Sequence, residues 1–317
     1  MYDQSGNRKH LFGPVPSRRL GNSLGIDLVP YKTCSLDCVY CECGRTTDLT
    51  IDQKEYAPTE EVIKELDSFL RENPLLDYVT FSGSGEPLLH SGIGEIIGWL
   101  KENYPAYPVA VLTNGTLLTQ QETRKQVGLA DLVIPSLDAI SEDVFRRINR
   151  PHPSLDNEEI ISGLEQFRRE YQGEIRLEVF VIPGLNNTEG ELALLGEAIR
   201  RIQPNLLQLN SLDRPGTEGW VGPASVDELA RCARILGEGE PIPGCLPNRG
   251  IPTPEKDPRS SIIPLLRRRP CTMEDLQHAL GFHPLELGKY LHQLVQENCV
   301  KAVREKRGIF YKMQDPS

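Results

Sequence analysis

The fold is decided by Thr33-Cys34-Ser35-Leu36-Asp37-Cys38-Val39-Tyr40-Cys41, in which three cysteines have the spacing Cys-x3-Cys-x2-Cys. Thiolates this close together repel one another and oxidise easily, so such a cluster is typical of a site for a soft metal. A structural zinc site takes four ligands, whereas three cysteines leave one position open. An iron–sulfur cluster held by three cysteines has one iron free to bind another molecule. The spacing therefore predicts a metal centre with an open position.

Length and composition set the limits of the interpretation. The chain has 317 residues, enough for one large α/β domain and a small one, and its 38% hydrophobic and 25% charged residues are typical of a soluble globular protein. The net charge of −10 argues against a globally basic nucleic-acid binder, although it allows a local basic patch. No apolar run approaches the roughly 20 residues that span a bilayer, so no membrane contact is expected. Eight cysteines, three of them clustered, favour a reducing compartment, which predicts a cytoplasmic protein.

Strand-like runs alternate with amphipathic stretches from residue 24 onward, which is the pattern of βα units in a parallel sheet. An open doubly wound sheet and a partial barrel both fit, and both bind ligands at the carboxyl ends of their strands. The cysteine cluster follows the first such end, so the chemistry is expected on that rim. The expected strands are 24–29, 78–81, 109–112, 132–135, 175–182 and 206–209, and the expected helices are 59–72, 92–103, 119–127, 157–171, 188–202 and 225–236.

Glycine and polar residues follow every expected strand. The second strand is followed by Ser82-Gly83-Ser84-Gly85-Glu86-Pro87, in which two glycines allow the backbone to approach a ligand closely. Polar residues after strands are common on any α/β rim, so each position alone is more simply explained as loop structure. The later rim positions include Asn114, Ser136, Asp138, Gly184 and Asn186.

Taken together, the cysteine spacing, the Gly83–Pro87 segment and the βα alternation resemble the radical S-adenosylmethionine (radical SAM) superfamily over roughly residues 11–215. The segment Phe12-Gly13-Pro14-Val15-Pro16-Ser17-Arg18-Arg19-Leu20-Gly21 is similar to the opening of an iron–sulfur oxidoreductase subgroup related to wybutosine-synthesis enzymes. The resemblance implies a partial (β/α)6 barrel, a [4Fe–4S] cluster and S-adenosyl-L-methionine (SAM). It also implies an electron donor of the flavodoxin or ferredoxin type.

The resemblance assigns roles to individual residues. Cys34, Cys38 and Cys41 are the expected cluster ligands, and Tyr40 is expected to contact the adenine of SAM through its backbone. The expected SAM contacts are Ser82, Gly83, Ser84, Gly85, Glu86 and Pro87 around the amino group, Asn114, Ser136 and Asp138 near the ribose or carboxylate, and Gly184 and Asn186 near the adenine. No catalytic residue and no substrate is assigned.

Cys43 and several arginines have more than one interpretation. Cys43 is either a bystander, a substrate contact or the fourth ligand of a zinc site. Arg18 and Arg19 either hold an anionic substrate group or form a solvated surface pair. The same two interpretations apply to Arg45 and Arg214. The remaining cysteines, Cys232, Cys245, Cys271 and Cys299, are interpreted as small buried residues.

The last quarter of the chain differs in composition from the rest. Residues 237–258 contain six prolines and four glycines, which predicts a linker or an extended wrap after a first domain of residues 1–236. Residues 259–317 predict a winged-helix domain. Thr272 and Asp275 are an expected helix-capping pair. The expected elements of this domain are helices 260–268, 272–280 and 284–298 and a hairpin of 300–304 and 309–312.

The sequence therefore predicts a radical SAM enzyme that cleaves SAM reductively and abstracts hydrogen from an unidentified substrate. One alternative is an RNA-modifying enzyme whose winged helix binds RNA. A winged helix that contacts a protein partner or presents the substrate is favoured over one that binds nucleic acid. Residues 255–317 carry 11 Lys and Arg against 8 Asp and Glu, but 284–298 contains Lys289 as its one Lys or Arg. A second alternative is a metal-sensing DNA-binding regulator, which requires four thiolate ligands including Cys43.

Overall fold

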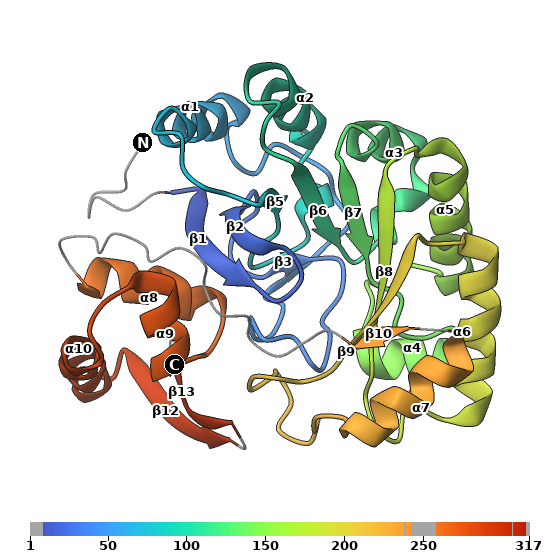
Figure 1. Ribbon diagram of the computed structural model, residues 1–317. Helices are drawn as coiled ribbons and strands as arrows, with labels where there is room; N and C mark the ends of the chain where they lie inside the picture. The colour runs from blue at the N-terminus through green and yellow to red at the C-terminus, as the bar shows by residue number, and fades with distance from the viewer. Residues whose placement is uncertain (1–8, 238, 242–257, 306, 315–317) are drawn as a thin grey trace.

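The computed structural model describes residues 9–237, 239–241, 258–305 and 307–314 (Figure 1). Its main body is an eight-stranded sheet in the order β1-β2-β5-β6-β7-β8-β9-β10. β1 pairs with β2 in antiparallel orientation, and every other neighbouring pair in the sheet is parallel. The strands are β1 (Leu11–Ser17), β2 (Gly21–Ile26), β5 (Tyr78–Phe81), β6 (Val109–Thr113), β7 (Leu132–Pro135), β8 (Glu174–Phe180), β9 (Leu206–Asn210) and β10 (Glu240–Pro241).

Helices follow the strands in an arc along the outside of this sheet (Figure 1). Two of these helices, α3 and α4, are short, with seven and eight residues. The longer helices cover the sheet with amphipathic faces. In α1, for example, Val62, Leu66 and Leu70 are buried because they recur at helical spacing. The six expected βα units are therefore present. The helices are α1 (Thr59–Leu70), α2 (Ile93–Asn103), α3 (Gln121–Val127), α4 (Glu142–Asn149), α5 (Asn157–Glu170), α6 (Glu189–Ile202) and α7 (Val226–Leu236).

Two parts of the main body differ from the expectation. The segment before residue 24, which is not among the expected strands, forms β1 and the first half of β2 as an antiparallel hairpin. Its prolines are tolerated because β1 is an edge strand. The helix α4 was not expected, because its eight residues bury only Phe145, Ile148 and Asn149 and, apart from Val144, are otherwise polar. A small two-stranded sheet of β3 (Thr33–Cys34) and β4 (Asp48–Leu49) encloses the cysteine loop.

The described residues from 258 onward form a compact unit, here called the C-terminal module. Its sheet has the order β11-β13-β12. The expected cap is confirmed, because the side chains of Thr272 and Asp275 each accept a hydrogen bond from the other residue's backbone N–H. Its elements are α8 (Pro258–Arg268), β11 (Cys271–Thr272), α9 (Met273–Leu280), α10 (Pro284–Gln296), β12 (Val300–Glu305) and β13 (Gly308–Met313).

The C-terminal module packs on the β1 edge of the main sheet (Figure 1). Its buried core includes Ile262, Leu276 and Phe310, and the same apolar cluster includes Val15 of β1 with Phe12 packed against it. The module is therefore joined to the main body by apolar packing as well as by polar contacts.

The remaining expectations concern the isolated cysteines, the linker and membrane-spanning helices. Cys232 and Cys271 are buried as expected, whereas Cys299 is only half-buried. Most of the expected linker, including Cys245, lies outside the described residues. Across the described part of the chain, no helix combines the length and apolar character needed to cross a membrane.

Candidate functional site

The three clustered cysteines lie on one loop at the carboxyl edge of the sheet. Cys34 ends β3, and Cys38 and Cys41 follow it in the loop. All three thiols are free and half-buried. The loop is held against the end of α4, where the Val39 N–H donates to the Ile148 carbonyl at 2.9 Å. The three sulfurs are therefore presented from one short segment with a fixed backbone.

Each sulfur of this triad accepts a hydrogen bond from a nitrogen donor, and Cys43 does not share this feature. The Cys43 thiol instead donates to the Arg268 carbonyl oxygen at 2.7 Å. N–H donors stabilise negative charge on sulfur, whereas a thiol that donates must keep its proton. The three contacts are Asn114 Nδ2 to Cys34 Sγ at 3.6 Å, Asn149 Nδ2 to Cys38 Sγ at 3.4 Å and Lys32 Nζ to Cys41 Sγ at 3.1 Å.

The arrangement of these cysteines distinguishes between kinds of metal centre. Within the described ranges, no three His, Cys, Asp or Glu side chains converge closely enough to hold a single metal ion. A four-thiolate zinc site that includes Cys43 is therefore not formed here. Burial raises the pKa of Cys34 to about 12 and also raises the pKa of Cys38, so both thiols favour the protonated form in the absence of a cation. Three free thiols with N–H donors fit a multi-iron cluster, which is wider than one ion.

The loop that follows β5, residues 82–87, packs directly against the cysteine loop. The Glu86 N–H donates to the Thr33 carbonyl at 3.1 Å. The Ser84 hydroxyl donates to Asp27 Oδ2 at 3.0 Å, which ties the loop to the end of β2. A Cβ on Gly85 would lie 2.0 Å from the Thr33 carbonyl oxygen, so only glycine fits this close approach of two backbones.

Glu86 is almost completely buried and connects this loop to the loop after β6. It accepts hydrogen bonds from the Thr113 hydroxyl at 2.6 Å, the Asn114 N–H at 2.8 Å and the Leu88 N–H at 3.0 Å. Burial raises the pKa of Glu86 to about 7, although the Asn114 N–H and the Thr113 hydroxyl oppose this shift. Glu86 therefore fixes Asn114, which in turn contacts Cys34.

Asp138 is the centre of a second buried polar group. Its carboxylate accepts from the Tyr40 hydroxyl at 2.5 Å, Asn149 Nδ2 at 2.7 Å and the Phe180 N–H at 2.9 Å. Burial raises its pKa to about 6, against the effect of these donors. The Tyr40 ring stacks on Phe180 with centroids 3.8 Å apart. Asn186 donates to the Asp138 carbonyl at 2.8 Å, so Asp138 and Asn186 serve to hold the surrounding loops in place.

Two adjacent cavities open at this edge of the sheet. The cysteine-loop cavity, of about 230 Å³, is lined by Cys34, Cys38, Asn114, Ser136 and the residues 82–86 except Ser84. The arginine cavity, of about 280 Å³, lies beside it and includes Cys41, Cys43 and Tyr40 in its wall. The two cavities share Arg19, Ser82, Gly83, Leu112 and Glu178, so they meet at a common boundary.

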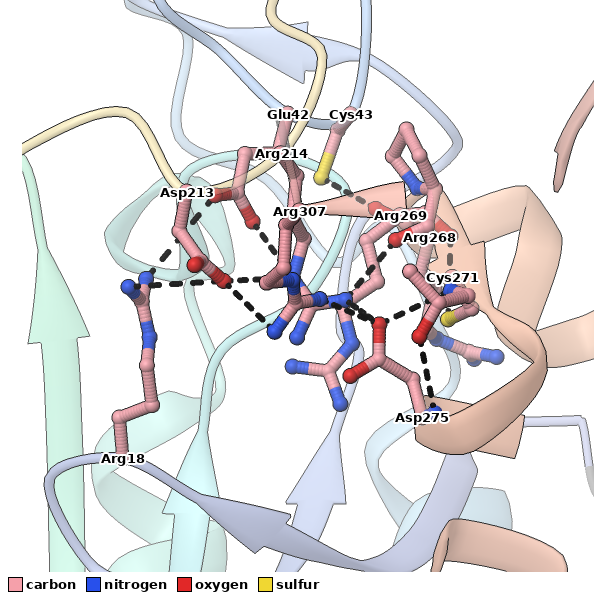
Figure 2. Close-up of polar contacts among 12 residues, drawn as sticks. Arg18, Glu42, Cys43, Asp213, Arg214, Arg268, Arg269, Cys271, Asp275 and Arg307 are labelled. Carbon is pink, nitrogen blue, oxygen red and sulfur yellow. Dashed lines mark hydrogen bonds and ion pairs between the residues drawn. The ribbon is translucent and has the colours of Figure 1, made fainter. Parts of the chain in front are cut away.

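The structure separates the four arginines singled out from the sequence. Arg18 and Arg19 line the arginine cavity, where Arg19 forms an ion pair with Glu178. Arg45 is on the surface, with 68% of its side chain exposed, and it pairs with Glu218. Arg214 is only 2% exposed and belongs to a buried network with the C-terminal module (Figure 2). Gly184 has a positive φ of 80° in the loop after β8 and lines neither cavity.

Sequence reasoning missed the residues that the C-terminal module contributes to this site. Leu265, Arg268 and Arg269 line the arginine cavity. The run Arg267-Arg268-Arg269 at the end of an expected helix was the available signal. Its position opposite the cysteines depends on contacts between residues more than 200 positions apart in the chain, such as that of Cys43 with Arg268.

Comparison with known proteins agrees with this geometry. The sequence profile of the Radical SAM superfamily matches residues 28–195, which include the cysteine loop and strands β5 to β8 of the sheet. The chain belongs to the radical SAM superfamily. It is 35% identical over 229 residues to a UPF0026 protein of Methanocaldococcus jannaschii, covering 72% of this chain and 71% of that protein. It is 34% identical over 296 residues to a protein named GTPase Obg in Brachyspira hyodysenteriae, covering 92% of this chain and 43% of that protein.

A solved structure of TYW1 with a lysine-pyruvate adduct bound shares the fold of this radical SAM protein, with a TM-score of 0.53 and 19% sequence identity. The match covers 72% of this chain and 76% of that chain. The mixed α/β arrangement described above is thus the radical SAM fold. Membership of the superfamily makes this protein an enzyme whose cofactors are a [4Fe–4S] cluster and SAM. Radical SAM enzymes also require a reductant.

Proposed function

We propose that this protein cleaves SAM reductively and abstracts a hydrogen atom from an organic substrate, with Cys34, Cys38 and Cys41 as the cluster ligands. The observation that carries the proposal is the N–H donor at each of these three sulfurs. Cys43 keeps its thiol proton for the Arg268 carbonyl, which supports three ligands rather than four. When bound, the cluster and SAM supply the electron and the carbon-centred radical for the reaction.

The cysteine-loop cavity is the proposed SAM site. The backbone of Gly83 and Gly85 allows close approach of a ligand, and the side chains of Asn114 and Ser136 offer hydrogen-bonding groups. Glu86 has both carboxylate oxygens engaged by protein donors, so its proposed role is to position the loop that carries Asn114. Ser84 and Pro87 lie in the same loop and complete its fixed shape.

The buried group around Asp138 is proposed to position the adenine side of this site. Asp138 holds the Tyr40 hydroxyl, and the stacking of Tyr40 on Phe180 fixes the residue that precedes Cys41. Asn186 fixes the loop after β8, in which Gly184 provides the turn. These residues exclude water and hold the loops while the substrate reacts in the neighbouring cavity.

The C-terminal module is proposed to be a winged-helix unit that acts within the enzyme. The order of its helices and its β11-β13-β12 sheet support this assignment. Its α8 contributes to the wall of the arginine cavity, which supports a role in substrate enclosure rather than in binding an RNA chain. The division into a main domain of residues 1–236, a linker of 237–258 and a module of 259–317 belongs to the same proposal. The proposed electron donor is of the flavodoxin or ferredoxin type.

The test is anaerobic reconstitution of the full chain, followed by addition of dithionite and SAM. We expect about four iron atoms per chain and release of 5′-deoxyadenosine and methionine. Cys34→Ala, Cys38→Ala and Cys41→Ala should each lose the cluster and this release. Cys43→Ala and the control Cys299→Ala should retain both the iron and the cleavage products.

Two results would contradict the proposal. One is a fully loaded protein that releases neither product. The other is loss of iron in Cys43→Ala as severe as in the triad variants, because Cys43 would then act as a ligand.

A further inference from the structure

The arginine cavity is built from two parts of the chain that are far apart in sequence. Its floor comes from the sheet, through residues such as Ser23, Thr80 and Leu112, and part of its wall comes from Leu265 and Arg268 of α8. A volume of about 280 Å³ lies near the lower end of the roughly 300–1,000 Å³ range of small-molecule sites. The cavity is therefore of a size for a small molecule and lies next to the proposed SAM site.

The lining of this cavity is positively charged. Four arginines, Arg18, Arg19, Arg268 and Arg269, face two glutamates, Glu42 and Glu178, which leaves a surplus of two positive charges. Arg19 and Glu178 neutralise each other as an ion pair. The positive charge of the lining therefore rests on Arg18, Arg268 and Arg269, of which Arg268 is also paired with Asp27 behind the wall.

Arg18 has hydrogen-bonding capacity that the protein does not use. Its side chain is 13% exposed, and the nearest carboxylate oxygens, on Glu42 and Asp213, are both 3.9 Å away. Within the part of the chain that the structure describes, its guanidinium donates no hydrogen bond. Figure 2 shows this guanidinium turned toward the carboxylates of Glu42 and Asp213. Burial lowers the pKa of Arg18 because it disfavours the charged guanidinium, and a bound anion would offset this effect.

Arg268 is held in place from several sides but also keeps an unsatisfied donor. Its guanidinium stacks over the Phe12 ring at 4.4 Å, and its Nη1 donates to the Pro264 carbonyl at 3.1 Å. Its Nε is buried without a hydrogen-bond partner among the described residues and lies 3.5 Å from Asp27 Oδ2. The ion pair with Asp27 and the stacking on Phe12 therefore fix this guanidinium in the cavity wall.

Two other arginines close to this cavity, Arg214 and Arg307, are occupied by contacts with the C-terminal module. Arg214 donates to Asp275 at 2.6 Å and to the Pro270 carbonyl at 3.0 Å, and Arg307 also donates to Asp275 at 2.6 Å (Figure 2). These contacts anchor the C-terminal module to the main body. Arg18 and Arg268 line the cavity with spare donors.

We propose that the arginine cavity binds the carboxylate or phosphate group of a small organic substrate, with Arg18 and Arg268 as its anion contacts. Guanidinium groups match the planar, bidentate geometry of these anions. The apolar part of the substrate lies against Phe12, Val15 and Leu265. The C-terminal module thereby supplies a substrate-binding residue. This assignment names the substrate class of the proposed function and rests on it for the reaction, although not for binding.

The test is a binding titration by ligand-observed NMR on the reconstituted full chain with SAM and without reductant. The probes are benzoate, phenyl phosphate, benzyl alcohol and benzylamine, which share an aromatic body and differ in charge. We expect at least one anion to bind and the alcohol and amine to bind at least tenfold more weakly. A preference between benzoate and phenyl phosphate identifies which anionic group the cavity takes.

The variants assign the contact to particular residues. Arg18→Gln and Arg268→Gln should each weaken binding of the anion by roughly ten- to a hundredfold, since each removes a charge-assisted hydrogen bond. Arg18→Lys and Arg268→Lys should recover part of the affinity because they keep the charge. The control is Arg169→Gln, which removes an arginine with 68% of its side chain exposed on α5. It should bind the anion as the unmodified protein does.

The proposal is overturned if the neutral alcohol binds as tightly as the anions. It is also overturned if the two Gln variants keep full anion affinity, or if they lose affinity for all four probes equally. Cleavage of SAM is measured separately on the same samples. Anion binding without SAM cleavage would refute the proposed reaction alone, and SAM cleavage without anion binding would refute the substrate class alone.

Discussion

Replacement of Arg214 by methionine should loosen the C-terminal module from the main body. Arg214 is 2% exposed and donates to Asp275, whose side chain is 5% exposed. Burial alone would raise the pKa of Asp275, but the charges of Arg214 and Arg307 and the Thr272 N–H together lower it. Arg214→Met keeps the apolar length of the side chain and removes its charge, so it leaves a buried carboxylate with fewer partners.

The size of the effect follows from the remaining contacts. Loss of one partner from a buried ion pair costs about 3–5 kcal/mol, which corresponds to roughly 150- to 4,000-fold more frequent opening. Asp275 keeps its bonds to Arg307 at 2.6 Å and to the Thr272 N–H at 2.9 Å, so we expect a cost near the lower end. The measurement is hydrogen exchange of backbone amides in α9 and β11, whose protection depends on docking of the module.

Two further variants make this reasoning testable. Arg214→Met/Asp275→Asn removes the unpaired charge but keeps an acceptor for the Thr272 N–H, so at least half of the protection should return. Arg201→Met is the control, because Arg201 is 40% exposed and its ion pairs should contribute at most about 1 kcal/mol. Exchange in Arg214→Met that is less than tenfold faster than in the unmodified protein would refute the argument, as would a double variant no better than Arg214→Met.

Two further predictions concern the main body. Gly85→Ala would place a Cβ 2.0 Å from the Thr33 carbonyl oxygen, so the iron content after reconstitution should fall severalfold. The control is Gly98→Ala, whose Cβ would have no atom within 4 Å; it should retain the iron and gain about 0.5–1 kcal/mol of stability. Equal iron contents in both variants would contradict the steric argument. Burial lowers the pKa of His90, whose Nε2 lies 2.7 Å from the Ala57 carbonyl, below its ordinary value of 6.5. As pH decreases, the unfolded chain therefore binds this proton at a higher pH than the folded chain does, so the denaturant midpoint should fall below about pH 6.5. In His90→Gln the midpoint should change less steeply with pH. An identical pH dependence in both proteins would exclude His90 as the source of the effect.

The main fold could be predicted from the sequence because its signals are local. The apolar runs of the parallel strands are buried on both faces, as in β7, where all four residues are buried. The capping pair of Thr272 and Asp275 was also visible, because both partners lie within one helical turn. The cysteine triad was equally plain, since its spacing is contained in eight residues.

The features that were missed depend on contacts between distant parts of the chain. The prolines of β1 kept this segment out of the expected strands, and its pairing with β2 at the sheet edge makes it a strand. The role of Arg268 depends on docking of α8 beside Phe12. Arg18 and Arg45 could not be distinguished in the sequence, although one lines a cavity and the other is exposed. Local periodicity carries no information about such long-range neighbours.

The two-part wall of the arginine cavity has a consequence for the order of events during synthesis. Chains emerge from the ribosome at about 5–20 residues per second, and N-terminal parts fold first. The loop that carries Cys41 and Cys43 is therefore in place well before α8, which contributes Leu265 and Arg268, has been made. During that interval the cysteines are accessible to incoming iron and sulfide. Translation order thus allows the metal centre to be assembled before the last part of the wall closes beside it.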